Sequence, residues 1–477
     1  MTLNPKTMRS RMTAPTLQTY GRVNGLPSSP GYVLTGMNEL VTMAPLVADA
    51  AKGDFSSLTP SSLGSLTASP WLAVDHNGKV AAYGEGTPPE GFCGWEQRSV
   101  SGGLILPGLV DSHTHPLWAG NRADEFVMKA QGKTYQEIAT AGGGIAATVR
   151  ASRLASDEEL LFSLKKRLEE MLRFGVTSIE VKSGYGLSVD EELRHLRLLA
   201  AAQRELPWLT LHITCLALHA LPPDGEERDI YIKRCSEELL PEAQRQGLIQ
   251  SVDAFVEQGY FSTVDILPYL QKAKDLGLGI RLHADEFSDS RAALLGLDWQ
   301  VQSLDHLQAM DPDIIPQWLQ KSPHTVATLL PGTSLYSRIP FARGQTLRQA
   351  GIPVALASDY NPGSCLIRNL PLVASLAAVH CGLSVPEVVA GITLIPAFSL
   401  GLLPLDWGSK SWQKPERLAA DSTAPATQPG PKGALAPGFD ADMVHFPHQS
   451  LSQWIADFGQ TMPHHVWLRG GDRAERE

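Results

Sequence analysis

The sequence predicts an α/β protein built on a closed (β/α)8 barrel. From about residue 104 to 400, short apolar and β-branched runs alternate with helical segments, as in repeated βα units around a parallel sheet. An open doubly wound sheet is the alternative, but it would normally carry a glycine-rich phosphate loop after its first strand, and none is present. The eight expected strands cover residues 109–115, 176–182, 209–217, 251–258, 279–284, 301–306, 325–330 and 353–359.

Capping signals mark two of the helices between these strands. Ser156 and Glu159 have the spacing of a capping box before LLFSLKKRLEEMLRF, a run that Gly175 ends. Ser188 and Glu191 repeat the same spacing before LRHLRLLAAAQ. The sequence therefore predicts helices between the first and second strands and between the second and third.

The two ends of the chain have a different character from the barrel. Segments such as WLAVDHNGKVAAYGEG before it and HHVWLRGG after it are short strand-like runs broken by Gly, Asn and Pro. Because neither end can bury a core alone, we expect both to pair into one small β-sandwich domain. The expected organisation is an N-terminal extension at 1–30, a small β-domain at 31–103 plus 433–477, a barrel at 104–407, and a mobile Pro- and Ala-rich insertion at 408–432.

Composition excludes several classes of function. With 40 Lys and Arg against 50 Asp and Glu, the net charge of −10 would repel nucleic acid. No run of about 18 apolar residues is present, and the first residues lack the apolar stretch of a secretory signal, so we expect a cytoplasmic protein without membrane contact. The five scattered cysteines argue against a disulfide framework, and we expect reduced, mostly buried thiols.

A His-x-His pair stands at the end of the first expected strand, LVDSHTH. His113 and His115 are two residues apart and so point to the same face of a strand. Two imidazoles in this arrangement can bind one metal ion. Such a pair can also arise by accident, so the assignment depends on what the other strands contribute.

Three further strands bring candidate residues to the same rim. His283 ends the fifth strand and Glu286 follows it, His306 ends the sixth, and Asp359 ends the eighth. Catalytic groups of such barrels collect at the carboxyl ends of the strands. We therefore predict one metal site from residues that are far apart in the chain.

Three imidazoles and one carboxylate suit zinc or iron, as one divalent or trivalent ion, with a position left for water. The metal would lower the pKa of that water to about 7 and supply hydroxide. Glu286 is the expected general acid and base, and His306 the expected stabiliser of the oxyanion. Their structural alternatives are a surface carboxylate and a core histidine.

With these residues in place, the chain resembles the amidohydrolase superfamily, and within it the imidazolonepropionases of histidine degradation. The resemblance covers about residues 102–400, and its metal pattern is that of the one-metal branch, with His113, His115, His283 and Asp359 as ligands. The lysine that bridges two metals in other branches is not evident. The narrower family is indicated by HPLWAGNRADEF, AGGGI at 141–145, KSGYGL at 182–187, LALHALPP at 216–223 and SDYNPGS at 358–364.

The resemblance implies roles for residues away from the metal. It makes Arg122 the ligand of the substrate's propionate, a role that suits a guanidinium because it can donate two parallel hydrogen bonds; a structural salt bridge is the alternative. Packing or turn formation are the alternatives for the remaining contacts. The implied substrate contacts are Tyr185, His219, Glu286, Asn361, Gly363 and Ser364.

The implied reaction is hydrolysis of 4-imidazolone-5-propanoate to N-formimino-L-glutamate by attack of metal-bound hydroxide on the ring carbonyl. Two rival functions stay open. Another one-metal amidohydrolase, such as a cytosine or guanine deaminase, would use the same ligands, and a non-catalytic amidohydrolase-like assembly protein would keep only the barrel. A homodimer is the expected assembly if the chain associates, although no interface can be identified in the sequence.

Overall fold

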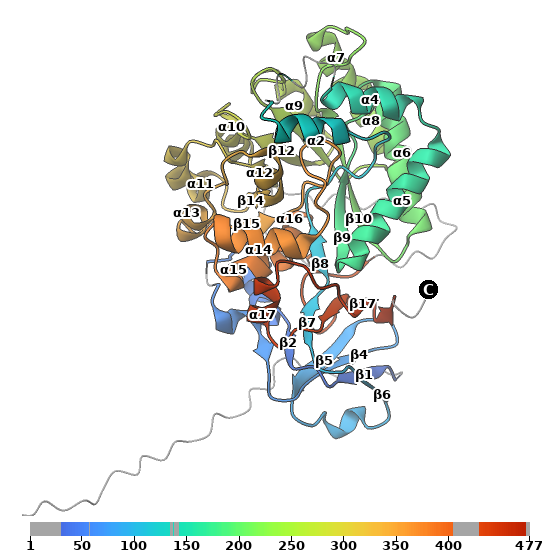
Figure 1. The fold of residues 1–477 in the computed structure, drawn as a ribbon, viewed down its shortest axis with the longest axis vertical. Helices are drawn as coiled ribbons and strands as arrows, with labels where there is room; N and C mark the ends of the chain where they lie inside the picture. The colour runs from blue at the N-terminus through green and yellow to red at the C-terminus, as the bar shows by residue number, and fades with distance from the viewer. Residues whose placement is uncertain (1–29, 57, 134–136, 138–142, 404–428, 474–477) are drawn as a thin grey trace, which may run out of the picture.

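The protein is described by a computed structural model that covers residues 30–56, 58–133, 137, 143–403 and 429–473. Eight parallel strands form one sheet in which each strand pairs with its neighbours in chain order (Figure 1). Every predicted strand is confirmed by an observed one. The strands are β8 (Leu109–Asp111), β9 (Val176–Lys182), β10 (Thr210–Leu218), β11 (Ser251–Val256), β12 (Gly279–Ala284), β13 (Ser303–His306), β14 (Val326–Leu329) and β15 (Val354–Leu356).

The first and last strands of this sheet meet just beyond their carboxyl ends. The Asp359 amide donates to the His113 carbonyl at 3.0 Å, and the His115 amide donates to the Tyr360 carbonyl at 2.9 Å. Thr114 and Tyr360 form a parallel bridge at the same level. The barrel is thus closed by the backbone segments that carry three of the predicted metal ligands.

Helices and short turns surround the barrel and connect its strands (Figure 1). The capping box of Ser156 and Glu159 is present at the start of α5 (Asp157–Arg173). At the start of α6 (Val189–Glu205), Ser188 accepts from the Glu191 amide, whereas the Glu191 carboxylate pairs with Arg194 at 3.0 Å. Only the serine half of the second expected box is therefore recorded.

The remaining helical elements are short. Those of the barrel are α2 (Ala123–Ala130), α4 (Ile145–Leu154), α7 (Arg228–Arg234), the π-helical η4 (Cys235–Leu239), α8 (Leu240–Arg245), α9 (Leu267–Asp275), α10 (Ala292–Trp299), η5 (Pro312–Ile314), α11 (Ile315–Lys321), α12 (Pro331–Ser337), α13 (Gly344–Gln349), α14 (Leu370–His380), α15 (Val385–Gly391) and α16 (Leu394–Ser399). Those near the chain ends are η1 (Ala44–Leu46), α1 (Val47–Ala50), η2 (Pro60–Leu63), η3 (Glu90–Phe92) and α17 (Leu451–Ala456).

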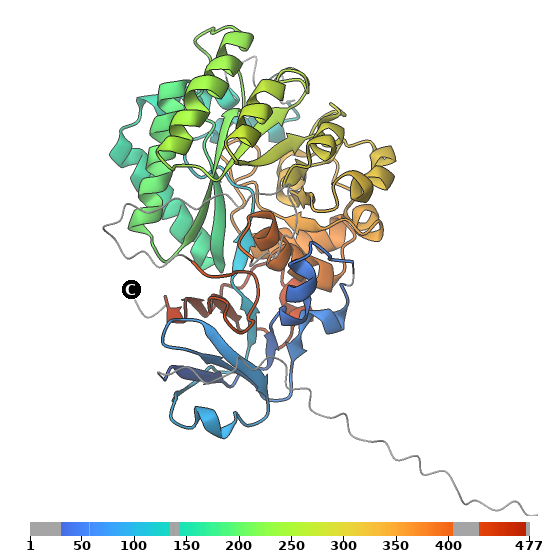
Figure 2. The ribbon, with the colours of Figure 1, turned by 180° about the vertical axis from the view of Figure 1, so that it is seen from behind.

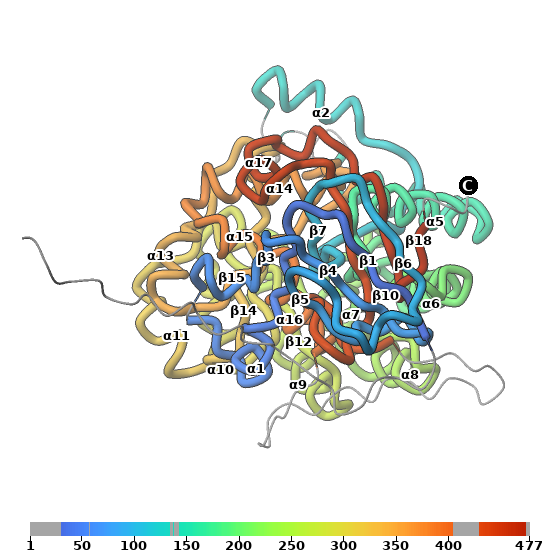
Figure 3. The backbone as a smooth tube through the Cα atoms, turned by 90° about the horizontal axis from the view of Figure 1, so that it is seen from below, coloured from blue at the N-terminus to red at the C-terminus, as the bar shows by residue number. Residues whose placement is uncertain are grey.

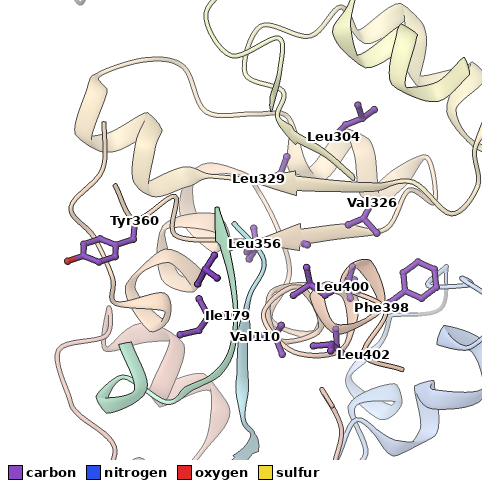
Figure 4. Packing of buried hydrophobic residues seen from close by; sticks show 14 of the residues in the cluster. Val110, Ile179, Leu304, Val326, Leu329, Leu356, Tyr360, Phe398, Leu400 and Leu402 are labelled. Atoms are coloured by element: carbon purple, nitrogen blue, oxygen red, sulfur yellow. The ribbon is translucent and has the colours of Figure 1, made fainter. Parts of the chain in front are cut away.

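Aliphatic side chains from many barrel strands belong to one buried hydrophobic cluster. Figure 4 shows Val110, Ile179 and Leu356 among the residues of this cluster, and each of the three is fully buried. Phe398 and Leu400, at the end of α16, belong to the same cluster. This continuous core fixes the strands rigidly, so the side chains at their carboxyl ends have defined positions.

Both ends of the chain contribute to a small β-domain at one end of the barrel (Figures 1 and 2). A four-stranded sheet has the order β5-β4-β1-β6, and a six-stranded sheet has the order β18-β17-β16-β7-β2-β3. The strands are β1 (Tyr32–Thr35), β2 (Glu39–Val41), β3 (Ser65–Leu66), β4 (Pro70–Val74), β5 (Val80–Glu85), β6 (Glu96–Ser99), β7 (Leu104–Pro107), β16 (Met443–Phe446), β17 (His465–Leu468) and β18 (Gly471–Asp472).

The six-stranded sheet joins the two ends of the chain directly. β7 pairs antiparallel with β16, and Figure 3 shows the blue N-terminal strands and the red C-terminal segments in the same region of the molecule. Residues of both sheets share one hydrophobic cluster that includes Leu72 and Ile105. The sheet extends to Pro107, beyond residue 103, where we expected the barrel to take over. β7 leads into β8, so the small domain lies at the amino end of the first barrel strand.

Several sequence expectations concern residues outside the described part of the chain. The extension at 1–30 and the insertion at 408–432 lie largely there, as do the first two residues of the AGGGI stretch. The five cysteines are described, and all are free, with Cys93 alone exposed. Within the described ranges, no helix has the length and apolar character needed to cross a membrane.

Candidate active site

The His-x-His pair is buried at the rim where the barrel closes. The His113 and His115 side chains extend from the segment after β8, and their Nε2 atoms are 3.4 Å apart. β8 itself ends at Asp111, earlier than expected, because the backbone beyond it bonds to the segment after β15. The two imidazoles nevertheless converge as the spacing predicted.

His283 and Asp359 lie beside this pair. The His283 ring centroid is 4.5 Å from that of His113 and 5.4 Å from that of His115. Asp359 Oδ1 is 3.6 Å from His113 Nε2 and 3.4 Å from His115 Nε2. The four residues predicted as ligands are thus brought together from three distant parts of the chain.

His306 lies closer to this cluster than its predicted role required. Two groups of side chains have ligand atoms that all lie within 4.8 Å of one another, and His113 belongs to both. One group adds His115 and Asp359, and the other adds His283 and His306. The His306 ring is therefore a neighbour of the ligand nitrogens as well as of the cavity.

Two carboxylates that the sequence analysis did not single out orient the ligand imidazoles. His113 Nδ1 is 2.6 Å from Asp305 Oδ2, and His283 Nδ1 is 2.9 Å from Asp253 Oδ2. Because a carboxylate only accepts, the hydrogen-bonded Nδ1 of His113 carries the hydrogen and its Nε2 presents a lone pair, while His283 Nδ1 faces Asp253 as an ion-pair neighbour. The available signal was a buried Asp within an otherwise apolar strand, as in SVDAFV.

These carboxylates are held by a buried ionic network beneath the site. The Lys182 ammonium is 2.7 Å from both Glu180 and Asp253, and Arg281 lies 3.3 Å from Glu180 and 3.8 Å from Asp305. All five side chains are completely buried. Lys182 is thus engaged with these acids, in agreement with a one-metal pattern that lacks a bridging lysine.

Asp359 is aimed at the histidines by its backbone and by a neighbouring hydroxyl. Its φ of 52° is in the left-handed region, which is unusual for a residue other than glycine and is common at functional sites. Thr333 Oγ1 donates to Asp359 Oδ2 at 2.5 Å, and Ser364 Oγ lies 3.4 Å from the same oxygen. Oδ1 is left facing His113 and His115.

The chemistry of this cluster fits a bound cation. Burial, the largest cause, together with neighbouring positive groups, holds the pKa values of His113 and His115 well below their usual range, so both rings are neutral. The lone pairs of His113 Nε2 and Asp359 Oδ1 would repel one another without a positive charge between them. Neutral imidazoles with one carboxylate are a common donor set for zinc and iron.

A cavity of about 470 Å³, part of it open to solvent, lies above the cluster. Six of the seven predicted substrate contacts line it, and Gly363 is the exception. The lining residues are His115, Arg122, Ile145, Tyr185, His219, Phe255, His283, Glu286, Phe287, His306, Asp359, Asn361 and Ser364.

Arg122 is placed in the cavity wall by the first turn of α2. Its side chain is buried and forms an ion pair of 2.7 Å with Glu125 Oε2. The other Glu125 oxygen accepts from the Gly144 amide at 2.9 Å, at the start of α4. The salt bridge considered as the structural alternative is therefore present, and the guanidinium lines the cavity as well.

Tyr185 and His219 form one side of the cavity. The His219 ring lies stacked on His115, with centroids 5.5 Å apart and an interplanar angle of 22°. His219 Nδ1 is 2.9 Å from the Gly184 carbonyl, so Nδ1 carries the hydrogen and Nε2 is an acceptor. The Tyr185 ring is 5.4 Å from the His219 ring.

The Asn361 side chain forms hydrogen bonds that shape the loop after β15. Its Oδ1 accepts from the Gly363 and Ser364 amides at 2.8 and 2.7 Å. Its Nδ2 donates to the Asp359 carbonyl at 2.7 Å and to Ser364 Oγ at 2.8 Å. The turn-forming role raised for Asn361 is thus observed, at a position in the cavity wall.

Glu286 and His306 face each other across the cavity floor, with Oε2 and Nε2 3.7 Å apart. Burial, followed by the charges of Asp359 and Glu257, raises the pKa of Glu286 well above its usual value. Burial lowers the pKa of His306 to about 3, so this ring is neutral. When ionised, a carboxylate with a raised pKa is a stronger base and holds the proton that it receives, and a neutral imidazole can donate a hydrogen bond.

The fold is shared by solved structures of hydrolases and deaminases. An adenosine deaminase from Xanthomonas campestris with bound zinc superposes with a TM-score of 0.61 at 16% identity, over 94% of this chain and 93% of that one. A 5-methylcytosine deaminase from Klebsiella pneumoniae gives a TM-score of 0.65 at 16% identity, over 93% and 98%. The barrel with its small β-domain is the amidohydrolase fold.

Sequence comparison places the protein in a narrower group than the fold does. No protein-family model matches the chain. Curated imidazolonepropionases do: that of Idiomarina loihiensis is 42% identical over 303 residues, 63% of this chain and 74% of its own length. Those of Pseudomonas aeruginosa strain UCBPP-PA14 (41% over 317 residues, 66% and 78%) and Symbiobacterium thermophilum (41% over 304 residues, 63% and 71%) are similar. The chain belongs to the imidazolonepropionase family.

Proposed function

We propose that this protein hydrolyses 4-imidazolone-5-propanoate to N-formimino-L-glutamate. The observation that carries the proposal is the placement of two unlike groups in one cavity. The guanidinium of Arg122 lines its wall, and the cluster of His115, His283 and Asp359 lines its floor. Such a cavity suits a small ring with an anionic side chain, and the membership in the imidazolonepropionase family agrees with it.

His113, His115, His283 and Asp359 are the residues we propose to hold one zinc or iron ion. When bound, the ion would supply Lewis acidity, which activates water and polarises a carbonyl group. The support is the convergence of their ligand atoms, the carboxylate of Asp305 that fixes the tautomer of His113, and the carboxylate of Asp253 beside His283. Structural neighbours that contain zinc agree with this choice.

The substrate is oriented by its propionate. Arg122 donates to this carboxylate, and the ring then extends toward His115 and Asp359, with Tyr185 and His219 beside its plane. Ser364 and Asn361 lie in the loop after β15, which also carries Asp359, and both residues line the cavity. This orientation presents the ring carbonyl to the ligand cluster and keeps the aliphatic side chain at the cavity wall.

Two residues are proposed to handle protons and charge. As water adds to the ring carbonyl carbon, Glu286 takes its proton, and it returns this proton to the ring nitrogen as the carbon–nitrogen bond breaks. Its raised pKa means that it holds a proton readily at this stage. The neutral His306 donates a hydrogen bond to the carbonyl oxygen as negative charge develops there. The ring opens, and the products contain all atoms of substrate and water.

A direct assay tests this function. Purified protein is mixed with freshly prepared imidazolonepropanoate, and the loss of ring absorbance, formation of N-formiminoglutamate and release of ammonia are followed together. We expect ring opening without ammonia. Ammonia release from cytosine or guanine, with no ring opening, would instead identify a deaminase. Absence of turnover with every substrate by metal-loaded protein would favour the non-catalytic alternative.

The choice between zinc and iron, the cytoplasmic location and a homodimer stay predictions. We propose the cytoplasm because the expected substrate belongs to amino acid degradation. The homodimer is tested by light scattering of the full chain.

A further inference from the structure

The charge of the anchor arginine is already balanced inside the protein. Arg122 and Glu125 form a buried ion pair of 2.7 Å, and Glu125 is also fixed by the Gly144 amide. Because the two opposite charges are buried side by side, the pair brings no net charge to the cavity wall. A site for an anionic side chain therefore needs a further positive group nearby.

Lys129 is placed so that it can be this further positive group. Arg122, Glu125 and Lys129 stand three and then four residues apart, which places them on one face of α2. Lys129 Nζ donates to the Gly363 carbonyl at 2.8 Å and lies 5.6 Å from the centre of the Tyr336 ring in α12. The side chain thus bridges α2, α12 and the loop after β15.

The electrostatic surroundings of Lys129 connect it to both ends of the cavity. Partial burial, and then the charge of Arg122, lowers its pKa, while Glu125 and Glu286 act in the opposite direction. Lys129 does not line the cavity itself. Its influence on a ligand is therefore exerted through the field and through Gly363.

Gly363 is the residue through which Lys129 affects the position of the loop after β15. It is held through its amide by Asn361 Oδ1 and through its carbonyl by Lys129 Nζ. Its Cα faces the Arg122 guanidinium so closely that no side chain would fit between them. Lys129 thus keeps the loop against the arginine that receives the ligand.

We infer that Lys129 is a positioning and specificity-determining residue that makes this site selective for a side chain bearing one carboxylate. Two cations and one buried carboxylate leave a single positive charge, which matches one negative charge on the ligand. The inference deepens the proposed function and rests on it. It adds a residue for which the family resemblance implied no role.

The test separates the effect of the Lys129 charge from the effect of its hydrogen bond to the Gly363 carbonyl. Lys129→Gln keeps an N–H donor for the Gly363 carbonyl and removes the charge, Lys129→Arg keeps both, and Lys133→Gln removes a largely exposed lysine just beyond the same helix as the control. Each protein is assayed with imidazolonepropanoate. Binding of imidazole-4-propanoate and of its neutral amide is measured by competitive inhibition.

We expect Lys129→Gln to raise KM, and the inhibition constant of the propanoate, by about three- to thirtyfold, with kcat within about twofold. The neutral amide should bind as before, Lys129→Arg should restore propanoate binding, and added salt should narrow the difference. Lys133→Gln should match wild type.

Two results would overturn the role of Lys129 alone, provided that wild type turns over the substrate. One is wild-type propanoate binding by Lys129→Gln. The other is equal weakening of propanoate and amide, which would make the lysine a structural residue only. If wild type neither opens the ring nor binds the propanoate, the proposed function fails, and the inference fails with it. If Lys129→Gln does not fold, the Lys129→Arg protein and the salt dependence of wild-type KM decide: a salt-independent KM contradicts the inference.

Discussion

Gly363 lies against Arg122 so closely that a β-carbon at Gly363 would be 1.9 Å from Arg122 Nη1 and 2.3 Å from Cζ. The backbone of Gly363 is not in the left-handed region, so glycine is needed here for space and not for conformation. The family resemblance implied a substrate contact for Gly363. In the structure the absence of a side chain at Gly363 leaves room for the arginine, and its substrate contact stays a prediction.

Replacement of Gly363 by alanine is therefore expected to displace the Arg122 guanidinium. Because the ring-binding and ligand residues are untouched, KM for the anionic substrate should rise by about tenfold or more while kcat changes less. Steady-state kinetics measures both. Gly94→Ala, at an exposed glycine with no neighbouring atom within 4 Å, is the matched control. A Gly363→Ala protein with unchanged KM would mean that the guanidinium does not bind the substrate.

Arg122→Met should remove the propionate anchor. The expected loss is about 1.5–3 kcal/mol of binding, the usual worth of a hydrogen bond to a charged group, and it should be seen in KM. The variant also leaves Glu125 buried without its ion-pair partner, so thermal unfolding must be compared with wild type. Arg122→Lys keeps the charge and loses the two-pronged geometry, and it should fall between the two. Wild-type kinetics in Arg122→Met would make the anchor assignment wrong.

The barrel could be predicted from the sequence because each strand is a local pattern. The expected fifth strand, 279–284, agrees with β12 (Gly279–Ala284) at both ends. The expected first strand, 109–115, is too long, because after Asp111 the chain bonds to the segment after β15 and leaves the regular ladder. Such a departure depends on a partner some 245 residues away and has no local signal.

The ligand histidines could be found for a similar reason, since strand ends of a barrel meet at one rim. The residues that hold the ligand histidines could not be found from the sequence in this way. Asp305 was overlooked beside His306, although it contacts His113 across 192 residues of sequence. Thr333 likewise acts through a contact with Asp359 that no spacing in the sequence marks. Only the three-dimensional structure shows which polar residue faces which ligand.

Asp305→Asn should weaken metal binding without preventing it. Asparagine can still accept from His113 Nδ1, but the negative charge that strengthens Nε2 as a donor is lost, and such changes usually reduce metal affinity about 10- to 100-fold. Metal retained during dialysis against graded chelator concentrations measures the effect, independently of activity. Asp229→Asn, at an exposed position in α7, is the control. Equal retention by Asp305→Asn and wild type would exclude an orienting role.

Removal of the metal should abolish activity and reduce stability together. A ligand present at about 1,000 times its dissociation constant stabilises the folded state by about 4 kcal/mol, so chelated protein should melt at a lower temperature. Zinc and iron are then added back separately, and the ion that restores both turnover and melting temperature is the one used. Metal content is measured in every sample. Full activity in protein shown to contain no metal would contradict the site.

Asp440→Asn tests how the two chain ends are held together. Asp440 is almost fully buried and pairs with Lys79, from the N-terminal part of the small domain, and with Lys432 at 2.8 Å. Burial alone would raise its pKa, but Lys432 and Lys79 outweigh burial and hold the pKa below its ordinary value of 3.8. Breaking such a buried network should cost about 3–5 kcal/mol at about pH 7, measured by urea unfolding.

The pH dependence distinguishes this ionic contribution from simple packing. A carboxylate whose pKa is lowered by folding stabilises the folded state above its unfolded pKa, and this stabilisation is lost as the pH falls through the folded pKa. The difference in unfolding free energy between wild type and Asp440→Asn should therefore shrink below about pH 4. Asp229→Asn should show no comparable change. A difference that stays constant from neutral pH down to about pH 3 would show that the two lysines do not stabilise the charged form of Asp440.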